Sequence, residues 1–236
     1  MNILAVVPAR GGSKGLPGKN LADLGGLSLL GHAIRFAERC DGVEHTIVST
    51  DSPEIAAAAR GLGGDVPFAR PAELAGDDVG IWPVLQHALA EVDAAGRYDA
   101  VLLVSPTAPF RLPGDVADAQ RLLAGDLDAD GVVGAVDPGF SVAWTAVRSR
   151  DGWLEPLFPD ARAVVRRQDA ERILRISGSI YLFRAEFVRE QPDTWLGGRH
   201  LLLELPRDRG VDVDTADDLA LARAMLAAGV VTLPWL

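Results

Sequence analysis

The chain has 236 residues, of which 23 are basic and 33 acidic, so its net charge is −10 at neutral pH. This balance argues against a nucleic-acid partner, because nucleic-acid surfaces need clustered positive charge. No apolar run is long enough to cross a membrane, and no basic segment precedes an apolar one at the N-terminus as in a signal peptide. Cys40 is the only cysteine, which excludes an intrachain disulfide and a cysteine-based zinc site. We expect a cytoplasmic protein without a membrane partner.

Apolar runs and amphipathic stretches alternate along the first 136 residues. In chain order they predict a strand at 3–7, a helix from Ser28 to about residue 37, a strand at 46–49, a helix after Ser52 that ends near Gly61, a strand at 66–69, a helix at 84–92, a strand at 100–104, a helix at 115–123 and a strand at 131–136. Strands that alternate with helices of this length predict βαβ units and a mostly parallel sheet.

The pattern changes after about residue 138. Residues 140–177 contain no clear helix and alternate between polar and apolar residues, which predicts a β excursion that serves association or substrate contact. Regular alternation resumes with a strand at 179–183. A final helix is predicted at 215–228, where Thr215 and Asp218 have the spacing of a capping box. The expected fold is α/β and Rossmann-like, doubly wound around a mostly parallel sheet, in one domain that spans residues 1–236.

A glycine-rich loop follows the first strand directly. It reads Arg10-Gly11-Gly12-Ser13-Lys14-Gly15-Leu16-Pro17-Gly18-Lys19-Asn20. Glycines let backbone N–H groups converge on an anion without obstruction by a Cβ, and three cations, Arg10, Lys14 and Lys19, add positive charge. Such a loop is suited to bind a triphosphate and to stabilise charge that develops in phosphoryl transfer.

Two familiar phosphate motifs do not fit this loop. A Walker A loop would need glycine at position 13 and a hydroxyl residue at position 20, where the chain has Ser13 and Asn20. The glycine spacing also lacks the Gly-x-Gly-x-x-Gly of dinucleotide-binding folds. The alternative is a flexible surface turn. It is less favoured, because three cations follow directly after a buried strand.

Asp212 and Asp214 form the second candidate feature. Two residues apart in an extended segment, their carboxylates lie on the same face, and two like charges that are close need a cation between them. Oxygen ligands in a phosphate enzyme suit Mg²⁺. Alternatively, Asp214 caps the final helix and Asp212 is solvated, which is the favoured interpretation of the pair in isolation. Together with the phosphate loop, the pair favours a metal site.

Taken together, these segments resemble the CMP-N-acylneuraminate (CMP-sialic acid) synthetases, or acylneuraminate cytidylyltransferases, which couple CTP to a sugar acid and release pyrophosphate. The resemblance covers nearly the whole chain, and its most specific part is the loop from Val7 to Leu21. The weaker matches, in chain order, are Val48-Ser49-Thr50-Asp51, Arg70-Pro71-Ala72-Glu73-Leu74-Ala75, Ser105-Pro106-Thr107-Ala108-Pro109-Phe110-Arg111 and Asp212-Val213-Asp214-Thr215.

The resemblance implies a nucleotide-diphospho-sugar transferase fold and a role for individual residues. CTP would be bound by Ala9, Arg10, Gly11, Gly12, Ser13, Lys19, Asn20 and, near the base, Arg70. The catalytic groups would be Arg10, Lys14, Lys19 and Asp214, with Asp212 and Asp214 as the ligands of Mg²⁺. The small anionic acceptor would contact Ser105, Arg167, Gln168 and Arg175. The excursion at 140–177 would cross to a second subunit in a homodimer.

The sequence departs from the family mainly on the acceptor side. Ser105 replaces a glutamine, Ala143-Trp144 replaces a lysine, Ser177 and Ser179 stand in a segment that reads Asn-Gly-Ala-Ile-Tyr in the family, and residues 77–82 replace a hydroxyl-rich segment near the base. We therefore predict a Mg²⁺-dependent cytidylyltransferase for a sialic-acid-like sugar acid or a related anion.

Three alternatives stay open. One is a sugar-1-phosphate nucleotidyltransferase that uses another nucleoside triphosphate, and another is CMP activation of a non-sialic anion such as a phosphonate. The third is a non-catalytic nucleotide-binding regulator, against which the intact cations and aspartates argue. His32 and His87 are predicted to be packing or surface residues and Cys40 a buried apolar one.

Overall fold

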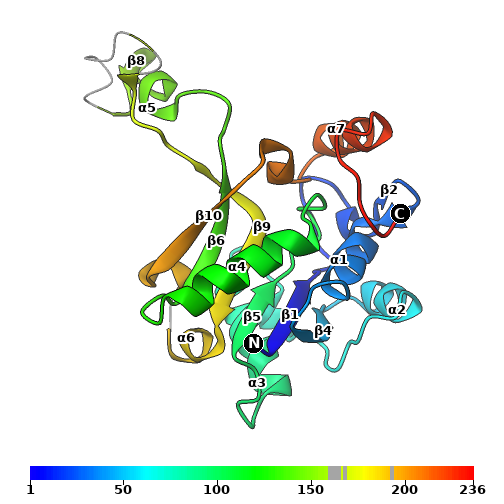
Figure 1. Cartoon of the computed structure of the whole chain (residues 1–236). Helices are drawn as coiled ribbons and strands as arrows, with labels where there is room; N and C mark the ends of the chain where they lie inside the picture. Colours follow the sequence, from blue (N-terminus) through cyan, green and yellow to red (C-terminus); the bar gives the residue numbers. More distant parts are fainter. Residues whose placement is uncertain (159–165, 167–168, 192–193) are drawn as a thin grey trace.

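The computed structural model describes residues 1–158, 166, 169–191 and 194–236 (Figure 1). A six-stranded sheet with the order β10-β6-β9-β5-β1-β4 forms its centre. The strands are β1 (Ile3–Pro8), β4 (Val43–Ser49), β5 (Ala100–Leu103), β6 (Gly131–Val136), β9 (Arg175–Arg184) and β10 (His200–Leu205). β1 pairs in parallel with β4 and β5, and β6 with β10, whereas β9 runs antiparallel to both of its neighbours. The predicted α/β fold with a mostly parallel sheet is confirmed.

Helices cover both faces of this sheet, which explains why its central strands are continuous apolar runs. Side chains alternate along β1, so that Ile3 and Val7 face one core and Leu4 and Val6 the other. The first core is covered by α1 (Leu29–Ala37), α2 (Pro53–Gly61) and α4 (Pro113–Gly125). The second core is covered by α3 (Ile81–Val92) and α6 (Ala185–Glu190). The last helix, α7 (Ala216–Ala227), packs on a smaller third cluster.

Three helices begin where the sequence predicts. The Ser28 hydroxyl accepts a hydrogen bond from the N–H of Gly31 at the start of α1, and the Ser52 hydroxyl accepts one from Ile55 at the start of α2. Thr215 and Asp218 form the predicted capping box of α7, in which each side chain accepts from the other's backbone N–H. These side chains satisfy N–H groups that the first turn leaves without a helical partner.

Other elements differ from the prediction. Residues 66–69 are not a strand, since β4 makes only a single bridge to Asp65 and Pro67 has no N–H to extend a ladder. Strand β9 is longer than expected and antiparallel, so that α/β alternation does not resume there in the regular way. Three features were not predicted from the sequence: α6, β10 and the hairpin of β2 (Asp23–Leu24) and β3 (Leu27–Ser28).

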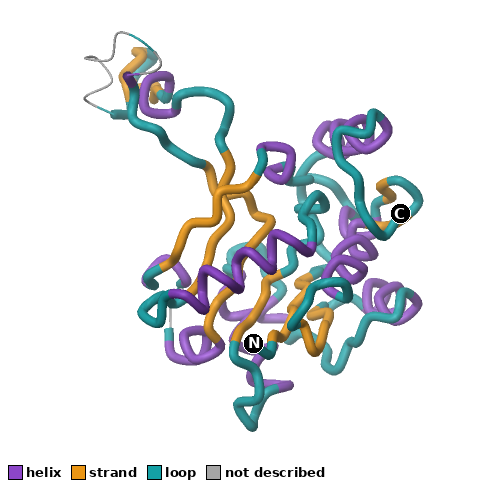
Figure 2. The backbone as a smooth tube through the Cα atoms, viewed as in Figure 1, coloured by secondary structure: helices purple, strands orange, loops and turns teal. Residues whose placement is uncertain are grey.

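The excursion projects away from the sheet on two long connections (Figures 1 and 2). Its described part contains a single helical turn, α5 (Val142–Thr145), and an antiparallel pair, β7 (Val147–Arg150) and β8 (Trp153–Pro156). The excursion ends earlier than predicted, because residues 175–177 already belong to β9. Short 3-10 helices complete the fold: η1 (Lys19–Leu21), η2 (Ala72–Leu74), η5 (Trp195–Gly197) and η6 (Arg207–Gly210). Among the described helices, none has the length and apolar character that a membrane crossing requires.

Candidate active site

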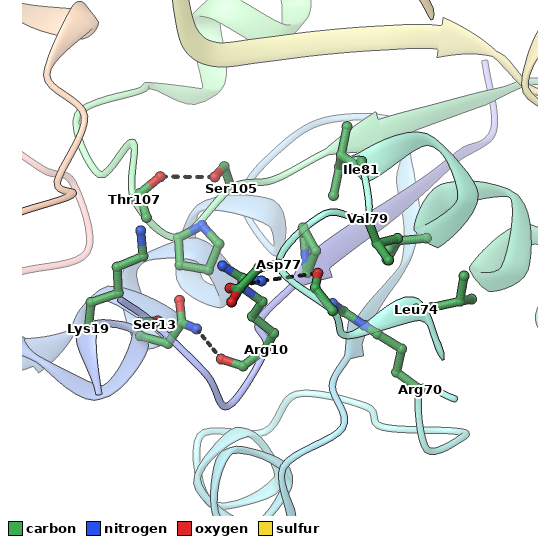
Figure 3. Close-up of a pocket in the computed structure, with 16 residues that line it drawn as sticks. Arg10, Ser13, Lys19, Arg70, Leu74, Asp77, Val79, Ile81, Ser105 and Thr107 are labelled. Atoms are coloured by element: carbon green, nitrogen blue, oxygen red, sulfur yellow. Dashed lines mark hydrogen bonds and ion pairs between the residues drawn. The ribbon is translucent and has the colours of Figure 1, made fainter. Parts of the chain in front are cut away.

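A cavity of about 260 Å³ opens just beyond the carboxyl ends of β1 and β5 (Figure 3). In open α/β sheets this edge is where ligands bind, because the loops that leave neighbouring strands meet there. The predicted phosphate loop contributes Arg10, Ser13, Lys19 and Asn20 to the lining, and the segment after β5 contributes Ser105 and Thr107. The sheet topology thus brings together residues that are about 90 positions apart in the sequence.

Hydrogen bonds from neighbouring strands hold the phosphate loop in place. The N–H of Gly11 donates to Asp51 Oδ1 at 2.9 Å, just after β4. The side chain of Asn20 is buried, and its Nδ2 donates to the carbonyl of Arg10 at 3.0 Å, which ties the two ends of the loop together. Gly18 has φ +67°, a conformation that favours glycine, where the loop enters η1. The loop is therefore a shaped element, and the alternative of a flexible surface turn does not hold.

Each of the three loop cations is paired with a carboxylate. Arg10 Nη1 lies 2.9 Å and Lys14 Nζ 2.7 Å from the two oxygens of Asp77, and Lys19 Nζ lies 2.7 Å from Asp214 Oδ1. The hydrogen bond from Lys14 and the nearby charges of Lys14 and Arg10 lower the pKa of Asp77. Figure 3 shows Arg10 and Asp77 side by side. Carboxylate oxygens of the chain itself thus occupy the positions beside the loop cations where we expect phosphate oxygens.

The remaining predicted nucleotide residues have different surroundings. Gly12 is open, with no atom within 4 Å of where a Cβ would stand, and so leaves its backbone accessible. Ala9 is buried in the first core, and its N–H donates to the carbonyl of Ser49 at 3.0 Å. A contact of Ala9 with a nucleotide would therefore be restricted to its carbonyl group.

Arg70 is a buried cation in the wall of the cavity. Its Nε donates to Ser49 Oγ at 3.1 Å, and burial lowers its pKa to about 10, against the opposing charge of Asp51. Leu74, Val79 and Ile81 form an apolar wall beside it (Figure 3). An apolar wall with one oriented polar group is the usual composition of a site for a small ring.

The aspartate pair adjoins the phosphate loop at Lys19, whose side chain also lines the cavity. Val213 is buried between the two aspartates, and its N–H donates to the carbonyl of Thr107 at 2.8 Å. Both aspartates are exposed, and Asp214 already binds the ammonium group of Lys19. Asp214 does not cap α7, since that cap is Thr215. Two accessible carboxylates that flank a fixed residue, one of them already bound to a cation, are a donor set that fits Mg²⁺.

Gly15 brings the phosphate loop against this aspartate segment. A Cβ on Gly15 would stand 2.5 Å from the carbonyl oxygen of Asp214, which is closer than real Cβ contacts allow. Residues 15 and 214 therefore approach through their backbones. The contact places the phosphate loop and the candidate metal ligands in one assembly.

The predicted acceptor residues lie in two places. Ser105 lines the first cavity, with its hydroxyl 3.1 Å from that of Thr107. Arg175 lies in a second cavity of about 330 Å³, which Asp212 also lines. Arg167 and Gln168 lie outside the described residues. The structure therefore separates Ser105 from Arg175 and places the aspartate pair between them.

Arg111 is a buried residue that was not among the predicted site residues. Its guanidinium is fully buried, donates to the carbonyl of Ser105 at 2.7 Å and lies 4.8 Å from the ring centre of Phe36. Burial lowers the pKa of Arg111 to about 9, and its Nε has no hydrogen-bond partner in the described part of the chain. Arg111 fixes the loop that carries Ser105 and Thr107. Only its place in the motif Ser105–Arg111 signalled this role, because an arginine is ordinarily expected at the surface.

The remaining candidates pack as predicted. His32 is buried, with Nε2 2.7 Å from the carbonyl of Leu24 and Nδ1 accepting from Trp235 Nε1 at 2.9 Å. Burial lowers the pKa of His32 and raises that of Cys40 to about 12. His87 packs edge-on against the ring of Phe68. None of the three lines either cavity.

The comparisons with known proteins identify the chain, with its α/β sheet and cationic loop, as a nucleotidyltransferase. A cytidylyltransferase family profile matches residues 4–93. The chain is 32% identical to the CMP-N,N'-diacetyllegionaminic acid synthase of Legionella pneumophila, over 96% of this chain and 97% of that protein. It is 30% identical to a 3-deoxy-manno-octulosonate cytidylyltransferase of Anaeromyxobacter dehalogenans, over 97% and 99%. The protein belongs to the cytidylyltransferase family.

Solved structures support the fold. A CMP:2-keto-3-deoxy-manno-octonic acid synthetase in complex with CTP superposes with a TM-score of 0.75 at 22% sequence identity, covering 97% of this chain and all of that one. A 4-diphosphocytidyl-2C-methyl-D-erythritol synthase gives a TM-score of 0.68 at 17% identity, over 95% and 98%.

Proposed function

We propose that the protein transfers CMP from CTP to a sugar acid and releases pyrophosphate in a Mg²⁺-dependent reaction. The observation that carries this proposal is the ion pair between Lys19 and Asp214, because it joins a cation of the phosphate loop, which lines the first cavity, to the candidate metal ligands. Neither element alone specifies the reaction. Together they provide the cations and the carboxylates that nucleotidyl transfer needs.

The chemistry follows from the loop. Arg10, Lys14 and Lys19 would bind the triphosphate in place of their present carboxylate partners. A hydroxyl oxygen of the acceptor would then attack the α-phosphorus, the bond from that phosphorus to the pyrophosphate oxygen would break, and the hydroxyl proton would leave to solvent. These residues would act by positioning the reactants and by balancing the charge that moves onto pyrophosphate.

Asp212 and Asp214 would hold Mg²⁺, which would neutralise phosphate oxygens. Lys19 now occupies one oxygen of Asp214, so it would exchange this carboxylate for a phosphate when the metal is bound. Arg70 and the apolar wall of Leu74, Val79 and Ile81 would receive the cytosine base.

A sugar acid is the acceptor class that the relatives favour. Their names specify diacetyllegionaminic acid and 3-deoxy-manno-octulosonate, and a third, the N-acylneuraminate cytidylyltransferase of Escherichia coli, is 38% identical over 51% of this chain. These acids share a carboxylate, and the second cavity contains Arg175. We place the reaction in the cytoplasm, since the substrate is CTP and the lone Cys40 needs no oxidising compartment.

Turnover of defined substrates tests the proposal. The purified protein is incubated with CTP, Mg²⁺ and, in turn, legionaminic, sialic and 3-deoxy-octulosonic acids, with pyrophosphate release and the mass of the CMP conjugate as readouts. We expect product with at least one acid, and none after removal of divalent metal with EDTA. Product with another nucleoside triphosphate and none with CTP would contradict the proposal.

We also propose that the protein forms a homodimer through the excursion. In its described part, Trp153 is 78% and Leu154 71% exposed, and Phe140 and Val147 are also exposed. Apolar side chains gathered on a projecting arm indicate a protein interface. Light scattering should give twice the mass of 25.0 kDa, and Trp153→Lys with Leu154→Lys should give the monomer mass. A wild-type monomer at micromolar concentration would contradict this proposal.

A further inference from the structure

The second cavity adjoins the candidate metal site, and no residue of the phosphate loop is part of its described lining. Its lining includes Asp212 and Arg175, together with Arg207 from η6. The neighbouring Asp214 faces Lys19 of the first cavity, so the aspartate pair connects the two cavities. A molecule in the second cavity would therefore lie beside the candidate metal ligands.

Two arginines in this cavity have no carboxylate partner among the residues that the structure describes. Arg175 donates one hydrogen bond, from Nη2 to the carbonyl of Gly210 at 2.5 Å, which fixes its direction. Arg207 is exposed, and its guanidinium has no hydrogen bond or ion pair with any residue that the structure describes. It lies directly against the Cα of Gly139, where a larger side chain would overlap it. The glycine thus provides the space in which the Arg207 guanidinium lies.

This lack of partners contrasts with the other arginines nearby. Arg209, two residues further along η6, pairs with Asp115 at 2.8 Å, and Arg172 pairs with Glu204. Three aspartates also line the cavity: Asp218 binds the cap of α7, Asp137 accepts from the N–H of Gly139 at 2.6 Å, and Asp212 is a candidate metal ligand. Because none of the three forms an ion pair with Arg175 or Arg207, no carboxylate in the described part of the chain occupies the two guanidinium groups, and they can receive an anion from outside.

We propose that Arg207 acts with Arg175 as the binding site for the carboxylate of the acceptor. The inference rests on the proposed function and makes Arg207 a specificity-determining residue of that reaction. A planar guanidinium matches a carboxylate with two parallel hydrogen bonds, and two such groups select an acid over a neutral sugar. The carboxylate would enter the second cavity, with the rest of the acceptor toward Asp212.

The test uses Arg207→Gln and Arg207→Lys, with Arg172→Gln as the matched control. Arg172 is an exposed arginine of the same region whose guanidinium is already paired. Loss of charge-assisted hydrogen bonds predicts a rise of about 10- to 100-fold in the KM for the acceptor acid in Arg207→Gln, with less than about two-fold change in the KM for CTP. Arg207→Lys should recover part of the loss, and Arg172→Gln should behave as wild type.

An acceptor whose carboxylate is converted to the amide separates recognition from a structural effect. The wild-type protein and Arg207→Gln should use this neutral analogue equally poorly. An equal loss on the acid and the amide, or an unchanged KM for the acid, would overturn the inference.

A measurement of acceptor binding separates failure of this inference from failure of the proposed function. If the wild-type protein makes no CMP conjugate, the proposed function fails. Calorimetric titration of the acids into wild type and Arg207→Gln then decides the role of Arg207. Binding that is at least 10-fold weaker in the variant supports it, and equal binding or no binding to either protein refutes it.

Discussion

Substitution of Gly15 by alanine tests whether the phosphate loop and the aspartate segment act as one assembly. The added Cβ would stand 2.5 Å from the carbonyl oxygen of Asp214, and tolerated contacts begin between 3.0 and 3.4 Å. The two backbones must therefore separate by about 0.5 to 0.9 Å, a difference set by these distances. Misplacement of about 1 Å in a catalytic site costs on the order of 100-fold in rate. We expect kcat/KM for the acceptor to fall by about 10- to 100-fold, the range expected for displacements of this size.

The assay is continuous pyrophosphate release at saturating CTP, repeated over a range of Mg²⁺ concentrations. The variant should require more Mg²⁺, because Asp214 moves relative to the loop, while its free energy of unfolding in urea falls by about 1 to 3 kcal/mol, the usual cost of an added methyl group in a closely packed place. Gly114→Ala is the matched control, since no atom lies within 4 Å of its added Cβ, at the start of α4. Activity of Gly15→Ala within two-fold of wild type would show that the two segments work independently.

Three further predictions concern residues around the site and in the core. Asp77→Asn should lower the KM for CTP by about two- to five-fold at low salt, because it removes the carboxylate that competes with phosphate for Arg10 and Lys14. An unchanged or raised KM for CTP would refute this competition. Arg111→Met should change the free energy of unfolding by less than about 2 kcal/mol, because the buried guanidinium has no carboxylate partner in the described part of the chain. It should still raise the KM for the acceptor through loss of the bond to Ser105, and wild-type kinetics would contradict the positioning role. Burial lowers the pKa of His32 from its ordinary value of 6.5, so below that pH only the unfolded chain takes up the proton. The contribution of His32 to the free energy of unfolding should therefore be constant above about pH 7 and should fall below pH 6.5, by at most about 1.4 kcal/mol per pH unit. Urea unfolding of His32→Leu over the same range should lack this contribution.

The loop expected to bind the phosphates of CTP was predictable because its residues are consecutive in the sequence. A buried strand followed by glycines and three cations predicts an anion-binding loop, and four residues of that loop, Arg10, Ser13, Lys19 and Asn20, line the cavity. The partners of those cations were not predictable. Asp77 was interpreted as part of a departure from the family, and its contact with Arg10 and Lys14 depends on how residues 75–80 fold back over the loop.

Long-range pairing limited the prediction of the fold in the same way. Residues 175–184 alternate as a strand should, but nothing in the segment itself reveals that it inserts antiparallel between β5 and β6. The short polar turn at 197–199 obscured the start of β10, which pairs with β6 from His200 onward. Direction and neighbour are set by tertiary contacts, and periodicity within one strand does not report them.

The ion pairs of the site indicate how nucleotide and metal would depend on each other. Asp77 neutralises Arg10 and Lys14, and Asp214 neutralises Lys19, so the loop carries no unpaired cation among these three. In the proposed reaction a triphosphate would have to replace Asp77, and a metal ion at Asp214 would release Lys19, since one carboxylate oxygen cannot serve both cations at full strength. Release of Lys19 then provides the third positive charge for the triphosphate. A bound triphosphate would draw Lys19 away from Asp214, and a bound metal ion would free Lys19 for the triphosphate. Each ligand should therefore raise the affinity of the protein for the other.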